Sequence, residues 1–344
     1  MIPRLLINFC YLFFIMAGIP AGSIADDRDV AVAEKILAFQ RSNGGWPKNY
    51  DYDVPGTKAE LENAISDRQK IEDATIDNGA TFKEIQFLAK LYRKTEDPRY
   101  SKAANQGVDY LLEAQYENGG WPQFYPNLKG YYRRITFNDG AMIGVMTLLR
   151  GIVTRPGAYQ FVTDSVRDDC KLAIEKGLDC MLKCQVKVDG RPAVWCAQHD
   201  EVSFLPTSAR SYELATLSGS ESVGIVRYLM GIEDPGHEVV AAIEGAVTWF
   251  EKSKLKGIRL ESFTNRDGEK DLRVVNDEKA SALWARFYDI DTNQPVFCSR
   301  DGVPQKNLDA ISHERRNGYS WLGEYARDLL AKDFPGWKAE RGLQ

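Results

Sequence analysis

Two short segments of this chain are near copies of each other, and their spacing limits the folds that the chain can adopt. Residues 40–47 read QRSNGGWP and residues 115–122 read QYENGGWP, while a fainter third copy starts at Gln185 and reaches Trp195. Each copy follows an apolar helical stretch, and successive copies begin roughly 70 to 75 residues apart. A single helical hairpin cannot close a core, so the pattern predicts an array of hairpins that stack or form a ring.

The turn in each copy leads to an aromatic residue. An Asn-Gly-Gly turn lets the chain leave a helix through positive φ angles, and Trp46 and Trp121 then follow at the same end of their hairpins. If the hairpins close into a ring, we expect these aromatic side chains to face a shared cleft. Such a cleft suits sugar rings or polyprenyl chains, and the charged residues nearby decide between them.

Helical periodicity recurs along the chain, and no linker or low-complexity tract divides the part after the N-terminus. Apolar residues at i, i+3 and i+4 predict helices over 29–40, 79–92, 100–116, 140–149, 168–184, 220–229, 238–252 and 324–332. The stretches 194–209 and 258–305 lack this periodicity and are predicted to be loops with short strands, such as 273–275 and 295–297.

The first 25 residues have the pattern of a secretion signal. Arg4 supplies a positive charge, residues 5–19 are almost entirely apolar, and Ser23-Ile24-Ala25 offers small residues for cleavage. The apolar run is short for a membrane span, and no stop-transfer sequence follows it; an uncleaved anchor helix is the alternative. We therefore expect a signal peptide over 1–25, one domain over 26–344, and a secreted or periplasmic protein with no membrane association after cleavage.

Composition excludes some partners. The chain has 344 residues with a formal net charge of −5, and its positive and negative residues are interspersed. The absence of a basic stripe argues against nucleic acid, and we expect a monomer. Removal of the signal would leave five cysteines, an odd number that predicts at least one free thiol. We expect Cys180 and Cys184, four residues apart, to be packing residues rather than metal ligands.

A second repeated feature places acidic and amide side chains at the start of two helices. Residues 75–80 and 136–141 share the frame Thr-x-[Asp/Asn]-[Asp/Asn]-Gly-Ala. Helix N-capping would explain one such residue per copy, but it does not explain two in both copies. The carboxylates, Asp77 and Asp139, occupy opposite positions of the pair, and ring symmetry would aim both toward a shared centre. We favour metal or substrate binding over capping alone.

Missing motifs exclude several enzyme classes. The chain has no Gly-rich phosphate loop, Rossmann fingerprint, His-Glu-x-x-His or nucleophile elbow, and three histidines are too few for a multi-histidine metal site. Oxygen ligands from Asp and Asn favour a hard cation such as Ca²⁺. Three loop cations, Lys48, Arg210 and Arg300, each also fit a surface ion pair. Taken with the two Asp residues, they form a candidate site for a metal and an anionic ligand.

The chain resembles the family 10 polysaccharide lyases, which are pectate lyases with an all-α toroid. This resemblance implies an (α/α) toroid or barrel of helical hairpins with long irregular loops and minor short strands. The motifs that carry it span nearly the whole chain after the signal. They are NGGWPK (43–48), IDNGAT (76–81), NGGWP (118–122), FNDGAM (137–142), WCAQHD (195–200), PTSAR (206–210), SRDG (299–302) and RRNGYSW (315–321).

The resemblance also implies an activity, namely Ca²⁺-assisted β-elimination on α-1,4-polygalacturonate. The C5 proton, which is α to the uronate carboxylate, is removed and the C4 glycosidic oxygen leaves. Matched by motif, Arg300 takes the role of the base, and Asp139 is the main calcium ligand with Asp77 assisting. The implied substrate contacts come from Lys48, Asn78, Arg210 and His199, with Trp46 stacking on a sugar ring.

An arginine base is unusual, because a guanidinium has a pKa above about 12 and carries only hydrogen-bond donors. We therefore expect either an alkaline pH optimum or a site that strongly depresses the pKa of Arg300.

Two other functions stay open. An α-toroid glycoside hydrolase would use Asp77 and Asp139 as acid and base but would leave Arg300 without a task. A secreted pectin-binding protein would have the same cleft and no turnover.

A third rival has a hydrocarbon substrate. Gln-x-x-x-Gly-x-Trp, present twice in this chain, also marks triterpene cyclases built from helical barrels. Those enzymes need an acidic initiating motif such as Asp-x-Asp-Asp, which this chain lacks. The signal pattern and the basic loop residues also argue against this rival.

Overall fold

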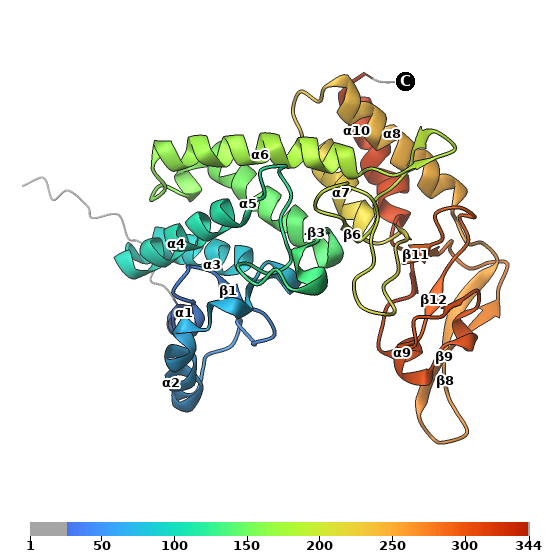
Figure 1. Ribbon diagram of the computed structural model, residues 1–344, viewed down its shortest axis with the longest axis horizontal. Coiled ribbons are helices and arrows are strands. Elements are labelled where there is room, and N and C mark those ends of the chain that lie inside the picture. The colour runs from blue at the N-terminus through green and yellow to red at the C-terminus, as the bar shows by residue number, and fades with distance from the viewer. Residues whose placement is uncertain (1–25, 343–344) are drawn as a thin grey trace, which may run out of the picture.

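The computed structural model describes residues 26–342 as a curved array of helical hairpins, with irregular loops and short strands at one end of the hairpins (Figure 1). The all-α class predicted from the sequence is confirmed. The α-helices are α1 (Asp27–Phe39), α2 (Lys58–Ser66), α3 (Phe82–Thr95), α4 (Pro98–Ala114), α5 (Ala141–Thr154), α6 (Asp164–Cys184), α7 (Glu221–Met230), α8 (His237–Lys252), α9 (His313–Asn317) and α10 (Phe334–Glu340).

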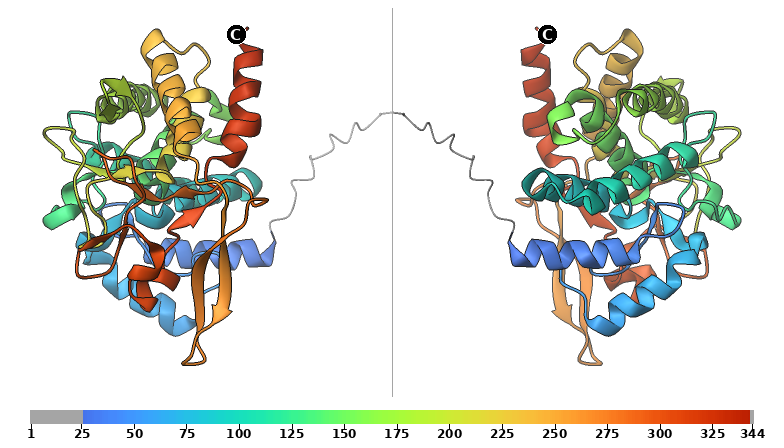
Figure 2. Two further views of the ribbon diagram at one scale, coloured as in Figure 1. Left: turned by 90° about the vertical axis from the view of Figure 1, so that its right-hand side faces the viewer. Right: turned by 90° about the vertical axis from the view of Figure 1, so that its left-hand side faces the viewer.

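The long helices form two layers. Within hairpins, α3 packs on α4, α5 on α6, and α7 on α8. Between hairpins, α3 contacts α5 and α5 contacts α7, while α1, α4, α6 and α8 follow one another in the second layer. The inner position of α5 agrees with its sequence, AMIGVMTLLRGIVT, which carries a single charged residue. Figure 1 shows α1 and α10 at opposite ends of the array, and the side views of Figure 2 show the N-terminal helix (blue) lying below the upright C-terminal helix (red).

The glutamine that opens each repeat joins one hairpin to the next. The Nε2 of Gln40 donates to the carbonyl of Gly44 in its own turn and to that of Ala103 in α4, both at 2.9 Å. A side-chain amide has two N–H donors, so one residue satisfies both carbonyls. The same pair of bonds recurs at Gln115, to Gly119 and Ala173, and at Gln185, to Ala193 and Ala242.

The Asn-Gly-Gly turns require glycine because they press against the next helix. Gly44 and Gly119 have φ angles of +92° and +90°. A Cβ atom at Gly44 would lie 2.1 Å from the carbonyl oxygen of Gln106, and one at Gly119 would lie 2.0 Å from that of Lys176. Both the positive φ and this close approach exclude a side chain.

The repeat tryptophans lie in the core rather than on a cleft wall. Trp46, Trp121 and Trp195 are all 0% exposed. Each indole N–H donates to a carbonyl of the preceding helix, as buried indoles usually do. The prediction that Trp46 stacks on a sugar ring is wrong, because no part of its ring reaches the surface. The acceptors are the carbonyls of Ile36, Leu111 and Met181, and Trp284 makes the same bond to Phe250 in a fourth turn that the sequence did not reveal.

Short antiparallel pairs join the turns to the loops between helices. The register sets Trp46 opposite Thr75, Ile135 opposite His199, and Ser218 opposite Phe287. A longer hairpin, β8–β9, projects from the body (Figure 1). The pairs are β1 (Trp46–Pro47) with β2 (Ala74–Thr75), β3 (Ile135–Thr136) with β6 (Gln198–His199), β4 (Lys187–Val188) with β5 (Arg191–Pro192), β7 (Leu217–Ser218) with β11 (Phe287–Tyr288), β8 (Ile258–Thr264) with β9 (Lys270–Asn276), β10 (Trp284–Ala285) with β14 (Leu322–Gly323), and β12 (Phe297–Cys298) with β13 (Pro304–Gln305).

Two helices were not predicted and one was misplaced. The helix α2 begins with a capping box, in which Thr57 Oγ1 accepts from the N–H of Glu60 and Glu60 accepts from the N–H of Thr57; this Thr-x-x-Glu signal was present in the sequence. The helix α9 is too short to show periodicity. At the C-terminus, helix spans 327–340 rather than 324–332 and includes a π segment over Leu329–Asp333.

The structure bears on three further sequence predictions, which concern the signal peptide, membrane association and the cysteines. The signal peptide over 1–25 lies outside the described residues. Within 26–342, no helix combines the length and apolar character needed to span a bilayer. The five cysteines of this region, including Cys180 and Cys184, are all free and buried. Free, buried thiols agree with packing roles.

Candidate functional site

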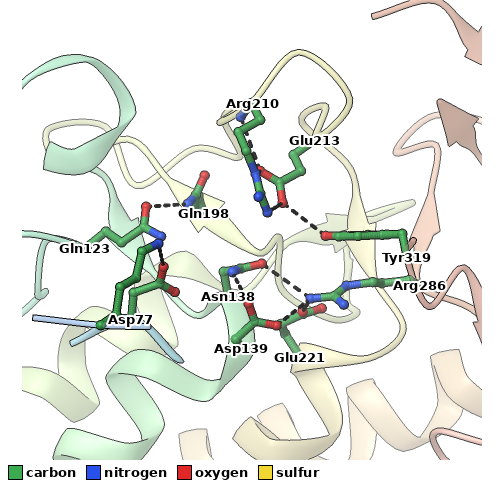
Figure 3. Close-up of polar contacts among 11 residues, drawn as sticks. Asp77, Gln123, Asn138, Asp139, Gln198, Arg210, Glu213, Glu221, Arg286 and Tyr319 are labelled. Carbon is green, nitrogen blue, oxygen red and sulfur yellow. Dashed lines mark hydrogen bonds and ion pairs between the residues drawn. The ribbon is translucent and has the colours of Figure 1, made fainter. Parts of the chain in front are cut away.

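Three equivalent turns place carboxylates at the same end of the inner helices (Figure 3). Asp77 precedes α3, Asp139 precedes α5, and Glu221 is the first residue of α7. In the first turn Thr75 Oγ1 accepts from the N–H of Asp77 at 3.0 Å, and in the third Ser218 accepts from the N–H of Glu221 at 3.0 Å. Glu221 was not identified from the sequence. Of the frame shared by the first two turns, the third turn retains only the hydroxyl residue, and its acidic residue comes later.

The Asp and Asn pairs in these turns are not helix caps. Asn78 and Asp139 have φ angles of 54° and 49°, inside single 3₁₀ turns that precede the helices. Asn and Asp tolerate this left-handed region better than other residues with a side chain. No side-chain capping bond is formed at the start of α3 or α5. The repeated frame therefore orients these side chains without using them as caps.

Asp77 keeps one carboxylate oxygen free. Its Oδ2 accepts from the Nζ of Lys48, and its buried Oδ1 has no hydrogen-bond partner among residues 26–342. The Nζ of Lys48 also lies 5.2 Å from the ring centroid of Phe124. Asn78 donates to the side chain of Asn49 at 3.1 Å. Since buried carboxylate oxygens are normally paired, the free Oδ1 is available to a ligand.

Asp139 lies beside a buried ion pair between Arg286 and Glu221, and its own side chain is 40% exposed. The Nη2 of Arg286 donates to Asp139 at 2.9 Å and also to Glu221, and the amide of Asn138 donates to the second oxygen of Asp139 at 2.7 Å. Burial opposes the charge of Arg286, but Glu221 and Asp139 outweigh it, so the pKa of Arg286 lies above its ordinary value. Arg286 was not identified from the sequence, because no motif marks the segment between β10 and β11.

Two buried glutamines lie beside the same space. Gln198 donates to Gln123 at 3.5 Å, and both come from strands or loops that adjoin β2 and β3. Figure 3 shows them between Asp77 and Arg210. Their amides add neutral donors and acceptors to a site that is otherwise ionic. Sequence analysis did not select either of them.

Three arginines surround one tyrosine at the edge of this site. The Cζ atoms of Arg210, Arg300 and Arg315 lie 4.9, 5.7 and 4.7 Å from the ring centroid of Tyr212. We call these four residues the Tyr212 cluster. A carboxylate pairs with each exposed member, Glu213 with Arg210 and Glu314 with Arg300. Hydrogen bonds that Arg210 donates to Glu213 raise the pKa of Arg210, and those that Arg300 donates to Glu314 raise the pKa of Arg300.

Arg210 and Arg300 differ in their connection to the carboxylates. Arg210 Nε donates to Glu213 at 2.7 Å, Tyr319 donates to the same carboxylate at 3.0 Å, and the Tyr319 ring lies 4.6 Å from the Cζ of Arg286 (Figure 3). A continuous chain of contacts therefore links Arg210 to Asp139. Arg300 joins this chain through the Tyr212 ring and through Glu314, which it shares with Arg315. The Cζ of Arg315 lies 5.9 Å from the Tyr319 ring, and the hydroxyl of Ser211 donates to the carbonyl of Arg300.

His199 cannot contact a substrate as the resemblance implied. It is 0% exposed, its Nε2 accepts from the N–H of Cys196 at 3.0 Å, and its Nδ1 lies 2.7 Å from the carbonyl of Phe204. Both ring nitrogens are thus used by the backbone. Burial lowers the pKa of His199 to about 4, so the neutral ring anchors the strand that carries Gln198. The predicted substrate contact is corrected to a structural role.

The buried His199 predicts acid-sensitive stability. Its pKa of about 4 in the fold lies below the unfolded value of 6.5, so the unfolded chain binds more protons between these pH values. The stabilisation is complete above pH 6.5 and is lost as pH falls toward 4, by roughly 3 kcal/mol at most. Urea unfolding of the His199→Gln variant, which is less stable overall, should show a smaller loss between pH 7 and 4.

Glu84 has the opposite effect on the pH dependence of stability and provides a control for that measurement. Burial raises the pKa of Glu84, which accepts from Tyr50 at 2.8 Å, to about 7. Its contribution is present below pH 4.5 and is lost as pH rises to 7, so Glu84→Gln should steepen the acid-dependent loss. The exposed His237→Gln should leave the slope unchanged. An unchanged slope in His199→Gln would contradict the assignment of this proton uptake to His199.

The donor set fits a hard cation only in part. Within residues 26–342 there is no group of three or more His, Cys, Asp or Glu side chains arranged to hold a metal. The free Oδ1 of Asp77 and the carboxylate of Asp139 are oxygen donors of the kind that Ca²⁺ prefers. Because two carboxylates cannot fill six to eight positions, further oxygens would have to come from water and an anionic ligand.

Comparisons with known proteins agree with this geometry. The family model described as pectic acid lyase matches residues 40–330. The family 10 polysaccharide lyase from Cellvibrio cellulosa is 36% identical, with a TM-score of 0.77, over 89% of this chain and 92% of that one. A mutant of that lyase in complex with trigalacturonic acid is 35% identical, with a TM-score of 0.76, over 89% and 91%. The search of curated proteins found no match.

Proposed function

The chain belongs to the pectic acid lyase family, the family 10 polysaccharide lyases, and from that premise we propose that it cleaves α-1,4-polygalacturonate outside the cytoplasm by Ca²⁺-assisted β-elimination with an arginine base. One observation carries the proposal. Carboxylates from three repeats, with a free oxygen on Asp77, lie across a space from Arg210, which belongs to the Tyr212 cluster (Figure 3). This arrangement suits an anionic sugar that is bound through both a cation and arginines.

In this proposal Asp139 and Asp77 would hold the calcium ion, with further oxygen ligands from uronate carboxylates. When bound, Ca²⁺ would withdraw charge from the substrate carboxylate and stabilise the carbanion-like transition state. The protein itself orients the substrate, since Lys48 and Asn78 lie on the Asp77 side of the site and the Tyr212 cluster lies on the other. The C5 proton passes to the base, the C4–O bond breaks with its electron pair on oxygen, and a C4=C5 double bond forms.

The base is an arginine, and the chain offers two candidates. Motif matching selects Arg300, which remains a prediction. Arg210 is the alternative, because hydrogen bonds through Glu213 connect it to Tyr319, whose ring contacts the Arg286 that pairs with Asp139. The carboxylate partners raise the pKa of both residues, so this site does not depress the pKa of either arginine. An alkaline pH optimum is the expectation that follows.

A single assay separates this function from its rivals. The protein is incubated with polygalacturonate and Ca²⁺ while unsaturated uronate absorbance and reducing ends are followed together. A lyase forms both at equal rates, whereas a glycoside hydrolase that used Asp77 and Asp139 would form reducing ends alone. A pectin-binding protein would form neither. Reducing ends without unsaturated product would overturn the proposed elimination.

Lys48 provides a test of substrate charge. Its Nζ lies between Asp77 and the Phe124 ring and is part-exposed, so it can reach a uronate carboxylate. A charge-assisted hydrogen bond contributes roughly 1.5–3 kcal/mol, or about one to two decades in kcat/KM. Lys48→Ala should lose that much on unesterified polygalacturonate and much less on highly methyl-esterified pectin, where the charge is masked.

The control for this variant is Lys90→Ala, an exposed lysine on α3, which should leave both activities unchanged. Removing Lys48 also deprives the buried Asp77 of its partner, so melting temperatures need to be compared. Equal proportional losses on the two substrates would mean that Lys48 supports the shape of the site rather than binding the uronate.

A further inference from the structure

Glu314 holds the position that a substrate carboxylate would take on two arginines. Arg300 donates to its two oxygens at 3.1 and 2.9 Å through Nε and Nη2. Arg315 donates to the same two oxygens at 2.9 and 2.6 Å, again through Nε and Nη2. One carboxylate therefore accepts two parallel bonds from each guanidinium. This two-point geometry is how arginine recognises carboxylates in general.

The exposure of the pair shows that Glu314 is free to leave. Its side chain is 54% exposed and that of Arg300 is 64% exposed. In the part of the chain that the structure describes, the carboxylate of Glu314 bonds only to these two arginines. Exposed ion pairs are weak, because both charges are well hydrated when they separate. Arg315 is only 8% exposed, so its guanidinium needs a carboxylate, and a competing one from solution can take the place of Glu314 on both arginines.

Glu213, in the same cluster, is a different kind of partner. Its side chain is only 8% exposed. It accepts from the side chain and from the backbone N–H of Arg210, the latter at 3.2 Å, and from Tyr319 at 3.0 Å. Losing it would leave the guanidinium of Arg210, which is 42% exposed, and the hydroxyl of Tyr319 without this shared acceptor. Glu213 is thus a buried support shared by Arg210 and Tyr319, whereas Glu314 is an exposed carboxylate that bonds to Arg300 and Arg315.

On the basis of the proposed function, we propose that Glu314 is a displaceable counterion, which covers Arg300 and Arg315 in the free enzyme and is replaced by a galacturonate carboxylate when substrate binds. Either role of Arg300 requires this exchange. To bind a uronate, its donors must first be released from Glu314. To accept a proton, it must lose the carboxylate that raises its pKa.

The exchange also changes the net charge of the Tyr212 cluster and its carboxylate partners. Among residues 26–342, the three guanidinium groups of the Tyr212 cluster form ion pairs with two carboxylates, Glu213 and Glu314. When Glu314 turns away, two positive charges are uncovered at one edge of the site. A polyanion gains from this change, whereas a neutral or esterified sugar does not. The uncovered arginines therefore favour charged substrate over neutral sugar, and Glu314 competes with that substrate for them in the free enzyme.

The test is the affinity of Glu314→Gln for galacturonate, measured by calorimetry. The monosaccharide has no glycosidic bond, so binding is measured without turnover. The variant keeps the size of the side chain and removes its charge, and we expect binding about two- to fivefold tighter than in the unmodified protein. The KM for polygalacturonate should fall by a similar factor, while the affinity for neutral galactose should not change.

Two glutamate variants serve as matched controls. Glu34→Gln removes the carboxylate from an Arg99 pair of similar exposure on α1 and α4 and should change neither Kd nor KM. Glu213→Gln should weaken binding, because it removes the support of Arg210. Glu314→Ala repeats the measurement if the glutamine variant proves unstable on melting.

The outcomes distinguish this proposal from the proposed function. An equal or weaker affinity and an equal or higher KM in both Glu314 variants would mean that Glu314 only orients Arg300, and the counterion proposal would be overturned. Absence of unsaturated product from the unmodified protein would instead overturn the lyase proposal. Tighter galacturonate binding by Glu314→Gln would then still support the counterion role, because the calorimetric measurement needs no turnover.

Discussion

Arg210→Ala is expected to lower kcat on polygalacturonate by roughly 10²–10⁴-fold, the range that a positioned general base contributes. The expectation rests on the contact chain from Arg210 through Glu213 and Tyr319 to Arg286 and Asp139. Arg300→Ala is expected to act mainly on KM, raising it by about one to two decades, because a more exposed arginine that binds a carboxylate contributes binding energy before and during the reaction.

Steady-state kinetics on both variants decide between the two arginines. Arg266→Ala, on the exposed turn of the β8–β9 hairpin, is the control and should behave like the unmodified protein. A collapse of kcat in Arg300→Ala with near-normal turnover in Arg210→Ala would assign the proton transfer to Arg300, as the motif comparison implies. Near-normal kcat in both would remove arginine from this step altogether.

Asp139→Asn is expected to reduce kcat/KM by about 10²–10⁴-fold, because a metal ion that stabilises transition-state charge contributes several kcal/mol. Asparagine is expected to adopt the backbone conformation of residue 139 without strain. Asn78 occupies the equivalent place in the first repeat with a φ of 54°, against 49° for Asp139. Arg286 also keeps Glu221 as a partner, so we expect the fold to be retained and the melting temperature to change little.

Calcium titration of activity tests the proposed ligand role directly. The variant should need a higher Ca²⁺ concentration for half-maximal activity, and a chelator should stop turnover by the unmodified protein without unfolding it. Asp179→Asn, which alters an exposed pair with Lys183 on α6, is the control. An unchanged calcium midpoint in Asp139→Asn would show that Asp139 pairs with Arg286 and does not bind the ion. A large fall in melting temperature on chelation would make the metal structural.

The sequence alone was sufficient to predict the architecture, because each copy of the repeat forms the same contacts with the next hairpin. The Gln, Gly-Gly and Trp of each copy perform the same contacts wherever the copy occurs, as Gln40 and Gln115 show. The paired Asp and Asn frame also identified Asp77 and Asp139, since repeated turns aim equivalent side chains in one direction. Residues 40–330 carry enough of this pattern for the family to be recognised.

Tertiary structure decided how exposed each side chain is and which charges meet. The sequence placed Trp46 and His199 at the substrate, but the packing of one hairpin on the next buries both. Arg286 and Glu221 are 65 residues apart and carry no shared motif, yet they form the ion pair beside Asp139. Side-chain burial and long-range ion pairs depend on how distant segments pack, so no local pattern could have revealed the counterion on Arg300 or the buried network below it.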